Sequence, residues 1–155
     1  MRKETRQAYQ GAKSLRWFLI SLALAAFTLN LIWELAQVFA FSSLEKASPL
    51  EVLILVTVAS IFDAGITLLA YMIVAGVRRG WRWWQQTRVA DLLIFAGVGA
   101  LAATLIELVA ISRGVWSYGS YMPLVPLLNI GLLPALQLTL LLPAALWVTL
   151  KVRER

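Results

Sequence analysis

Three carboxylic acids lie inside strongly apolar segments of this 155-residue sequence: Glu34, Asp63 and Glu107. A charged side chain in the middle of a bilayer costs at least about 2.5 to 3.5 kcal/mol on insertion scales, so such residues usually serve a function. A carboxyl group in an apolar pocket can stay protonated at neutral pH, because its ionised form is poorly solvated. It can then act as a general acid toward an alkene, an epoxide or a carbonyl group. We therefore take these three residues as candidate catalytic groups.

The segment NLIWELAQ, residues 30–37, carries its polar and aromatic side chains on one helical face. Asn30, Trp33, Glu34 and Gln37 follow the spacing i, i+3, i+4 and i+7, which places side chains on the same side of an α helix. The opposite face of the segment is apolar and can contact lipid. The spacing therefore predicts a polar stripe that faces other parts of the protein.

Every other long apolar segment also contains polar side chains. They are Asp63, Thr67 and Tyr71 in the second segment, Thr104 and Glu107 in the third, and Gln137 in the fourth. At about 1.5 Å of rise per residue, Glu34 lies about 10 Å below the non-cytoplasmic membrane boundary and Asp63 about 20 Å below it. We therefore expect one shared pocket in the outer half of the membrane, with Asp63 as its floor. The candidate substrate-binding residues around this pocket are Asn30, Trp33, Gln37, Arg113, Trp116, Tyr118 and Gln137.

The segment RGVWSYGSYMPLVP, residues 113–126, lies above the expected pocket and is rich in aromatic residues. Arg113 follows Glu107 by six residues. If the two form an ion pair, we expect Glu34 and Asp63 to be the working pair, and if Glu107 turns inward, we expect Glu34 and Glu107. Trp116 and Tyr118 either belong to an interfacial aromatic belt or form a lid over the pocket.

Four long apolar segments must position all of these residues. They cover about residues 17–41, 50–77, 89–112 and 128–150, in a chain that is 61% hydrophobic and only 14% charged. Each segment is long enough to cross a hydrocarbon core of about 30 Å, and their continuous apolar character favours helices over strands. Pro134 and Pro143 predict a kink or a locally unwound turn near Gln137. The sequence thus predicts an all-α integral membrane protein, a four-helix transmembrane bundle that forms a single domain over residues 1–155.

Lysine and arginine residues set the expected orientation. Twelve of the fourteen lie in the N-terminal segment, in the loop at residues 78–88 and in the C-terminal tail, and the other side carries only Lys46 and Arg113. We therefore expect both termini to be cytoplasmic. The motif RRGWRWW at residues 78–84 is either a topology anchor with interfacial tryptophans, which we favour, or a site for anionic lipid headgroups.

The sequence contains no cysteine and no histidine. This excludes disulfides and thiol redox chemistry within the chain, and it removes the usual ligands of haem, copper and zinc. A magnesium or calcium site built from carboxylates stays open, but we expect no cofactor and no metal. The basic residues lie at the ends of the apolar segments, where membrane topology explains their positions. We therefore expect no nucleic-acid partner.

Several short motifs occur together along the chain. They are N-x-x-W-E-x-x-Q from Asn30, an aspartate in the second apolar segment, E-x-x-x-x-x-R-G-x-W-x-Y from Glu107, Met122-Pro123, and G-x-x-P-x-x-Q from Gly131. In this combination the chain resembles small four-span bacterial inner-membrane proteins of unassigned function, and the resemblance covers nearly its whole length. A weaker likeness, carried by Trp33 and Glu34, is to integral-membrane terpene cyclases, which are longer and have more spans. That likeness implies a cyclase role for Glu34.

Three functions stay open on this basis. The first, which we favour, is an isomerase, cyclase or hydratase that acts on an isoprenoid- or lipid-like substrate, with Glu34 or Asp63 as the acid and tryptophan rings that stabilise a carbocation. The second is a non-catalytic membrane subunit, because intramembrane polar groups also hold helices together. The third is a small proton-coupled transporter, since stacked carboxylates suit a proton path. The expected partners are a membrane lipid or lipophilic small molecule, and a second copy of the chain or another membrane protein.

Overall fold

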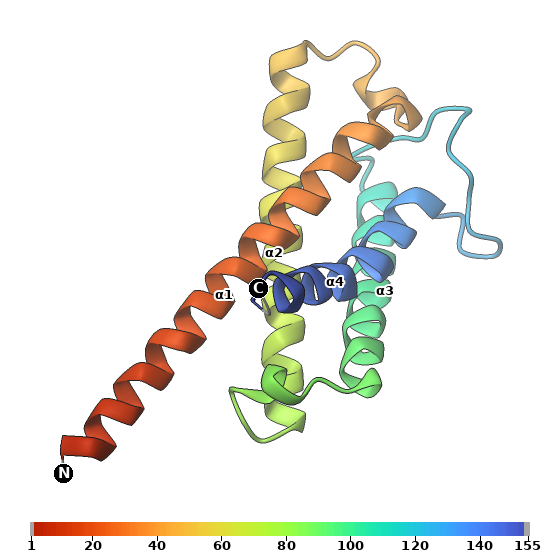
Figure 1. The fold of residues 1–155 in the computed structure, drawn as a ribbon. Coiled ribbons are helices and arrows are strands. Elements are labelled where there is room, and N and C mark those ends of the chain that lie inside the picture. The colour runs from red at the N-terminus through yellow and green to blue at the C-terminus, as the bar shows by residue number, and fades with distance from the viewer. Residues whose placement is uncertain (1, 154–155) are drawn as a thin grey trace.

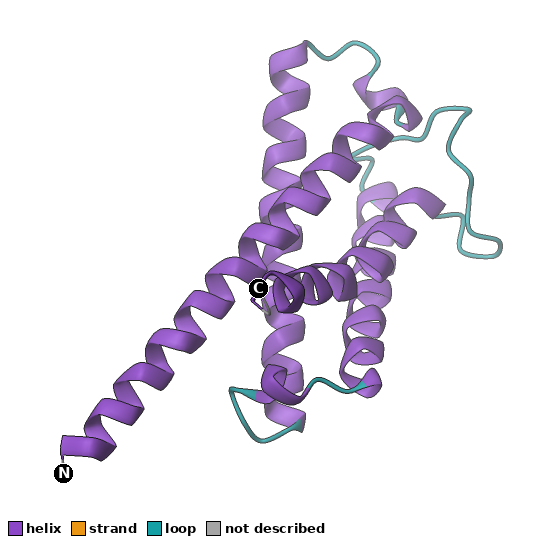
Figure 2. Cartoon of the chain, viewed as in Figure 1, coloured by secondary structure: helices purple, strands orange, loops and turns teal. Residues whose placement is uncertain are grey.

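The computed structural model describes residues 2–153, with side chains from Ser14 onward, and its long elements are all helices (Figure 1). They are α1 (Arg2–Gln37), α2 (Pro49–Val77), α3 (Val89–Ser112) and α4 (Leu132–Arg153), with short 3-10 helices at Val38–Ala40, Ser42–Leu44 and Trp83–Gln86. Figure 2 shows no strand in this part of the chain. The predicted all-α four-helix bundle is confirmed.

All four helices are long and apolar enough to cross a membrane. The candidate spans are Ser14–Ala40, Pro49–Val77, Val89–Ser112 and Leu132–Arg153. The shortest has 22 residues, against about 20 needed for the hydrocarbon core. By length and composition, the chain is therefore a multi-pass membrane protein.

The helices form a ring. α1 packs mainly against α2 and α4, and α3 packs mainly against the same two helices, so α1 lies diagonally opposite α3. Figure 1 shows α1 crossing the bundle obliquely, with its N-terminal part extending beyond the other helices. Because the ring is closed, side chains from different helices can meet at one central point.

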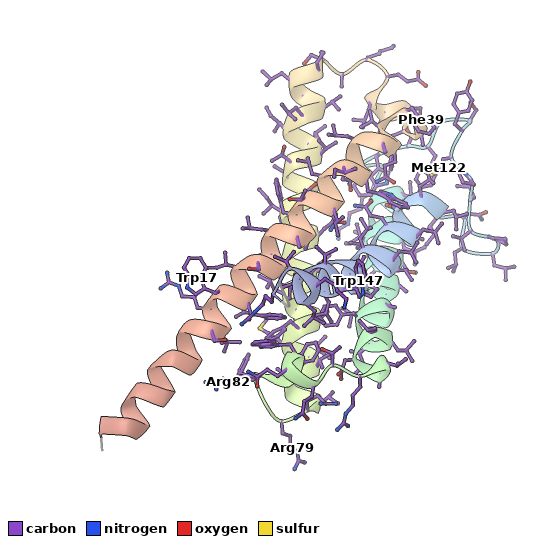
Figure 3. The ribbon with its side chains drawn as sticks, viewed as in Figure 1. Trp17, Phe39, Arg79, Arg82, Met122 and Trp147 are labelled. Carbon is purple, nitrogen blue, oxygen red and sulfur yellow. The ribbon has the colours of Figure 1, made fainter. Side chains whose placement is uncertain are left out.

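The basic segments gather at one end of the bundle. The Arg153 guanidinium donates a hydrogen bond to the Ser14 hydroxyl at 3.3 Å and lies over the Trp84 ring, 4.2 Å from its centroid. This contact brings the end of α4 to α1 and to the loop between α2 and α3. Figure 3 shows Arg79 of that loop at one end and Phe39 at the opposite end.

Local capping explains where α2 begins and where α3 ends. The Ser48 hydroxyl accepts the backbone N–H of Glu51 at 3.3 Å, and the Glu51 carboxylate accepts the backbone N–H of Ser48 at 2.7 Å. This reciprocal pair satisfies two N–H groups that have no partner inside the helix. At the end of α3, Gly114 has a φ of +63°, a left-handed conformation that glycine adopts without steric cost. Val115 can then donate its N–H to the carbonyl oxygen of Ala110 at 2.9 Å.

The fourth helix begins later than the apolar pattern predicts. The pattern predicts a helix from Leu128, but α4 begins at Leu132. The preceding residues Leu127 and Asn129 have φ angles of 71° and 53°, which a right-handed helix does not allow. Hydrophobicity alone does not distinguish a helix from an apolar loop, so the start of α4 could not be predicted from the sequence.

Neither proline unwinds α4 near Gln137. The helix is continuous from Leu132 to Arg153, so of the two predicted alternatives, a kink or an unwound turn, the unwound turn is wrong. Pro134 lies in the first turn, where a backbone N–H has no helical partner to lose. Gln137 therefore projects from regular helix.

A glycine allows α3 and α4 to approach closely. A Cβ atom on Gly99 would lie 2.1 Å from the carbonyl oxygen of Leu138. Any side chain at this position would therefore separate the two helices. The contact fixes the depth of the α4 turn that carries Gln137, the residue next to Leu138.

Candidate functional site

The side-chain amide of Gln137 lies where three helices meet. Its Nε2 atom is 3.0 Å from Oδ1 of Asn30, 3.0 Å from Oε1 of Glu34 and 3.0 Å from Oδ2 of Asp63. Asn30 is fully buried, and Asp63 and Gln137 are nearly so. A single amide on α4 thus contacts two residues of α1 and one of α2.

A second amide extends this network toward the end of α1. Gln37 Nε2 donates to Oε1 of Gln137 at 2.7 Å and to Oε2 of Glu34 at 3.1 Å. The indole N–H of Trp33 donates to Oε1 of Gln37 at 3.2 Å. Together with the contact between Asn30 and Gln137, these bonds place the whole polar stripe of NLIWELAQ in one network.

The network has more acceptors than donors around Gln137. A primary amide carries two N–H hydrogens, but three oxygen atoms lie within bonding distance of its nitrogen. In the described part of the chain, no lysine or arginine is paired with Glu34 or Asp63, and these two carboxyl groups interact electrostatically with each other. Two ionised carboxylates in such a place would repel one another. A proton on either of them supplies the missing donor and removes one charge.

Glu107 lies nearby on α3 but has its own partners. The Tyr118 hydroxyl donates to Oε2 of Glu107, and the Trp116 indole N–H donates to the same oxygen at 3.4 Å. The Tyr118 oxygen in turn accepts the backbone N–H of Gly131 at 2.7 Å. Glu107 is close enough to Glu34 for an electrostatic interaction. The three candidate catalytic groups therefore share one region, with Glu107 joined to the loop rather than to Gln137.

Tyr118 is held in its protonated form. Burial, together with its hydrogen bond to Glu107, raises the pKa of Tyr118 well above its ordinary value, which is about 10. The tyrosine therefore keeps its role as donor to Glu107 over the whole physiological pH range.

Arg113 lies outside this arrangement. Its side chain is exposed, and no ion pair joins it to Glu107 within residues 14–153. Glu107 is only 3% exposed and has turned inward. Of the two alternatives that the sequence left open for Glu107, the structure shows the inward one. Glu107 nevertheless bonds to Tyr118 and Trp116, and the two carboxyl groups that share the Gln137 amide are those of Glu34 and Asp63 rather than those of Glu34 and Glu107.

The loop after α3 is fastened to the end of α1 by contacts that sequence reasoning missed. The backbone N–H of Gly119 donates to the carbonyl oxygen of Ala40 at 2.8 Å, and the Ser42 hydroxyl donates to the carbonyl oxygen of Tyr118 at 3.1 Å. These residues are small, lie outside the long helices and follow no period, so no sequence signal marked them. They hold Tyr118 in place against Glu107.

The remaining polar side chains of the spans do not join the network. The hydroxyl groups of Thr67 and Thr104 donate to carbonyl oxygens of their own helices at 2.9 Å and 2.8 Å. The Tyr71 hydroxyl donates to the carbonyl oxygen of Trp81 near the basic end. Over the described residues, the connected polar groups therefore end at Asp63 and do not reach the basic end.

Side-chain amides lie between the carboxyl groups in the region where the sequence predicts a pocket. Gln37 and Gln137 connect the carboxyl groups by direct hydrogen bonds. A shallow, nearly flat hollow lies on the surface of α1 near the basic end, beside Leu15, Arg16, Leu19 and Ile20. No group of three or more acidic side chains in the described chain is arranged to hold a metal ion.

Comparisons with known proteins identify no relative. No protein-family model matches the chain, and neither a curated protein nor a solved structure matches it.

Proposed function

We propose that this protein is an intramembrane enzyme that acts on an isoprenoid- or lipid-like substrate through the acid–base chemistry of its buried carboxyl groups. The reaction is an isomerisation, a cyclisation or a hydration. Glu34 or Asp63 donates a proton to the substrate, the other carboxyl group accepts one, and Gln137 orients both. Glu107, held by Tyr118, is the third acidic group of the site.

One observation carries this proposal. Glu34 and Asp63 each place an oxygen atom 3.0 Å from the same amide nitrogen, with no lysine or arginine of the described chain paired to either. A protonated carboxyl beside an ionised one offers an acid and a base in one place. In an isomerisation, the acid forms a new C–H bond on one alkene carbon, and the base removes a proton from a carbon next to the resulting cation, so atoms and charge balance.

The surroundings of the site support an apolar substrate. The carboxyl groups lie among apolar membrane-spanning helices, which a lipid can approach from the bilayer. The rings of Trp33 and Trp116, whose indole nitrogens bond to Gln37 and Glu107, are placed at the site and can stabilise a carbocation.

The proposed location is the inner membrane of a bacterium, as the resemblance noted above implies. The arginine-rich end includes the loop of Arg79 (Figure 3) and the end of α4, where Arg153 bonds to Ser14. This end faces the cytoplasm, because positively charged loops are retained on that side. Glu34 and Glu107 then lie in the half of the membrane away from the cytoplasm.

A second candidate is a non-catalytic membrane subunit. The observation in its favour is that the amides of Gln37 and Gln137 already bond to one another and to the carboxyl groups. Interhelical hydrogen bonds of this kind stabilise membrane proteins by about 0.6 kcal/mol each on average. Glu34→Gln keeps the size of the side chain and one acceptor oxygen, and it replaces the other oxygen by an NH2 group. A purely structural network would therefore lose about one hydrogen bond, and the protein would stay folded.

Deuterium labelling separates the two candidates even when the substrate is unidentified. The purified protein is incubated in D2O with total lipid extract from the cells that produce it, and the lipids are analysed by mass spectrometry. An acid–base enzyme transfers solvent-derived deuterium to carbon in one lipid class, because the carboxyl proton exchanges with solvent. Any protein or lipid that co-purifies is identified in the same preparation.

The matched variants are Glu34→Gln and Glu45→Gln. Glu45 is exposed in the loop between α1 and α2, so its replacement leaves labelling unchanged, whereas Glu34→Gln abolishes it while the protein stays folded by circular dichroism. Labelling that is absent in the wild type, or that persists at full rate in Glu34→Gln, contradicts the proposed function. A stoichiometric protein partner without labelling supports the subunit instead.

A further inference from the structure

The loop that follows α3 ends in a short hairpin, residues 123–132, which leads into α4. Leu132 donates its backbone N–H to the carbonyl oxygen of Pro123 at 2.7 Å, and Val125 donates to Ile130 at 2.8 Å. Leu124 and Gly131 form an antiparallel bridge. Figure 1 shows this hairpin beside the bundle, with its tip below the C-terminal end of α3, so it lies alongside the helices and not beyond their ends.

One face of the hairpin packs on the protein, and the other is largely exposed. Ile130 is 2% exposed and Met122, just before the hairpin, is 6% exposed, so these two anchor it to the bundle. Leu127 at the tip is 98% exposed, and its neighbours Leu124 and Leu128 are about half exposed at 46% and 45%. The tip is therefore a cluster of leucines, Leu124, Leu127 and Leu128, in which the described chain leaves Leu127 uncovered and covers the other two only in part.

Both the conformation and the charge of the hairpin indicate what covers this cluster. Leu127 has a φ of 71°, in the left-handed region that usually takes glycine or asparagine. A leucine there has a conformational cost that its few contacts with the described chain do not offset, because it is 98% exposed. The sequence also contains no charged residue from Gly114 to Leu150, so nothing in the hairpin opposes transfer into lipid.

Backbone hydrogen bonding limits how deep the hairpin can lie. Within the described chain, the N–H groups of Val125, Asn129, Gly131 and Leu132 have partners, whereas those of Leu124, Leu127, Leu128 and Ile130 do not. Irregular backbone with open N–H groups does not occur in contact with the hydrocarbon centre, but it is tolerated at the boundary between headgroups and acyl chains. An exposed aromatic pair at the base of the loop, Phe39 and Tyr121 with ring centroids 6.4 Å apart, is typical of that same level.

We propose that the hairpin at residues 123–132 is a membrane-dipping element, whose leucine tip lies among the lipid acyl chains just below the headgroups of the leaflet opposite the arginine-rich end. The occupant of the uncovered cluster is thus lipid, and not a second protein. The proposal does not depend on catalysis. If the proposed function holds, the hairpin also connects the leaflet to the site, because Gly131 at its base donates to Tyr118, the partner of Glu107.

Single-cysteine labelling tests this placement directly. The chain contains no cysteine, so Leu127→Cys carries one environment-sensitive fluorophore on the full-length protein. The protein is reconstituted into phosphatidylethanolamine–phosphatidylglycerol vesicles whose acyl chains carry bromine either near the ester group or near the methyl end. Ser120→Cys, at an exposed polar position of the same loop, is the aqueous control, and Leu101→Cys, exposed on α3, is the lipid control.

We expect the emission of the Leu127 label to be blue-shifted relative to that of the Ser120 label. Bromine near the ester group quenches the Leu127 label more strongly than bromine near the methyl end does. Iodide in the buffer quenches this label much less than the Ser120 label. Three outcomes overturn the proposal: a Leu127 label that behaves like the Ser120 label, a label quenched best from the methyl end, or a label shielded from both iodide and bromine, which would mean that another protein covers the tip. None of these outcomes bears on deuterium transfer by the site.

Discussion

Replacement of Gln137 by leucine is the most direct test of the polar network. Leucine has nearly the size of glutamine, so the change removes hydrogen bonds without creating a large cavity. The amide can make two bonds as a donor at one time, to two of the three oxygens at 3.0 Å, and it accepts one from Gln37 at 2.7 Å. At about 0.6 kcal/mol per bond on average, and about 1.7 at most, the loss is between about 2 and 5 kcal/mol of unfolding free energy.

The assay is reversible unfolding in mixed micelles of a mild detergent and dodecyl sulfate, followed by far-ultraviolet circular dichroism. Thr139→Val is the matched control on the same helix, because the Thr139 hydroxyl donates only to the α4 carbonyl oxygen of Ala135, at 2.6 Å. Its replacement changes the unfolding free energy by no more than about 0.5 kcal/mol. If Gln137→Leu destabilises the protein no more than Thr139→Val does, the network does not hold the helices together and the reasoning is refuted.

Further predictions concern the packing, the loop and the basic end. Gly99→Ala destabilises the protein by about 1 to 3 kcal/mol, because its Cβ would meet the α4 backbone at 2.1 Å. The control Gly97→Ala, with nothing within 4 Å of its Cβ, is neutral or stabilises by up to about 1 kcal/mol through helix propensity. Equal effects of the two substitutions in the same assay would contradict the close contact between α3 and α4. Tyr118→Phe costs about 1 to 3 kcal/mol, because its hydroxyl bonds both a carboxylate and a backbone N–H. In the wild type, burial raises the pKa of Tyr118, so the unfolded state loses the tyrosine proton first and stability falls as the pH rises above about 10. If the Tyr118→Phe variant loses stability over the same pH range by the same amount, Tyr118 is not the group responsible. Arg153→Ala costs about 0.5 to 1 kcal/mol, since the guanidinium lies 4.2 Å from the Trp84 ring centroid, and unchanged tryptophan emission and stability would show that this contact is unimportant.

Much of the candidate site could be predicted because helical geometry is local. A helix places residues three, four and seven positions apart on one face, so the inward stripe of Asn30, Trp33, Glu34 and Gln37 follows from spacing alone. Polar groups must be sheltered from lipid, so Asp63, Glu107 and Gln137 are expected to face the same interior of the bundle. Spacing says nothing about which groups touch, and Gln137 did not stand out among the polar residues.

The choice of partner for Glu107 shows the limit of local reasoning. Arg113 follows it by six residues and Tyr118 by eleven, and both are chemically suitable. The path of an irregular loop decides between them, and that path depends on contacts with the end of α1, such as the bond from Gly119 to Ala40. The start of α4 was misplaced for the same reason, since an apolar hairpin and an apolar helix have the same composition.

The sequence by itself determined that four apolar helices cross a membrane with basic residues concentrated at one end, because these properties depend on composition, length and a fixed period. Only the tertiary structure decided that Gln137 is the centre of the network, that Glu107 bonds to Tyr118, and that the leucines before α4 form an uncovered tip. Each of these depends on which side chains of distant segments come within bonding distance, and that is set by helix packing at close contacts such as Gly99 and by the course of the loops.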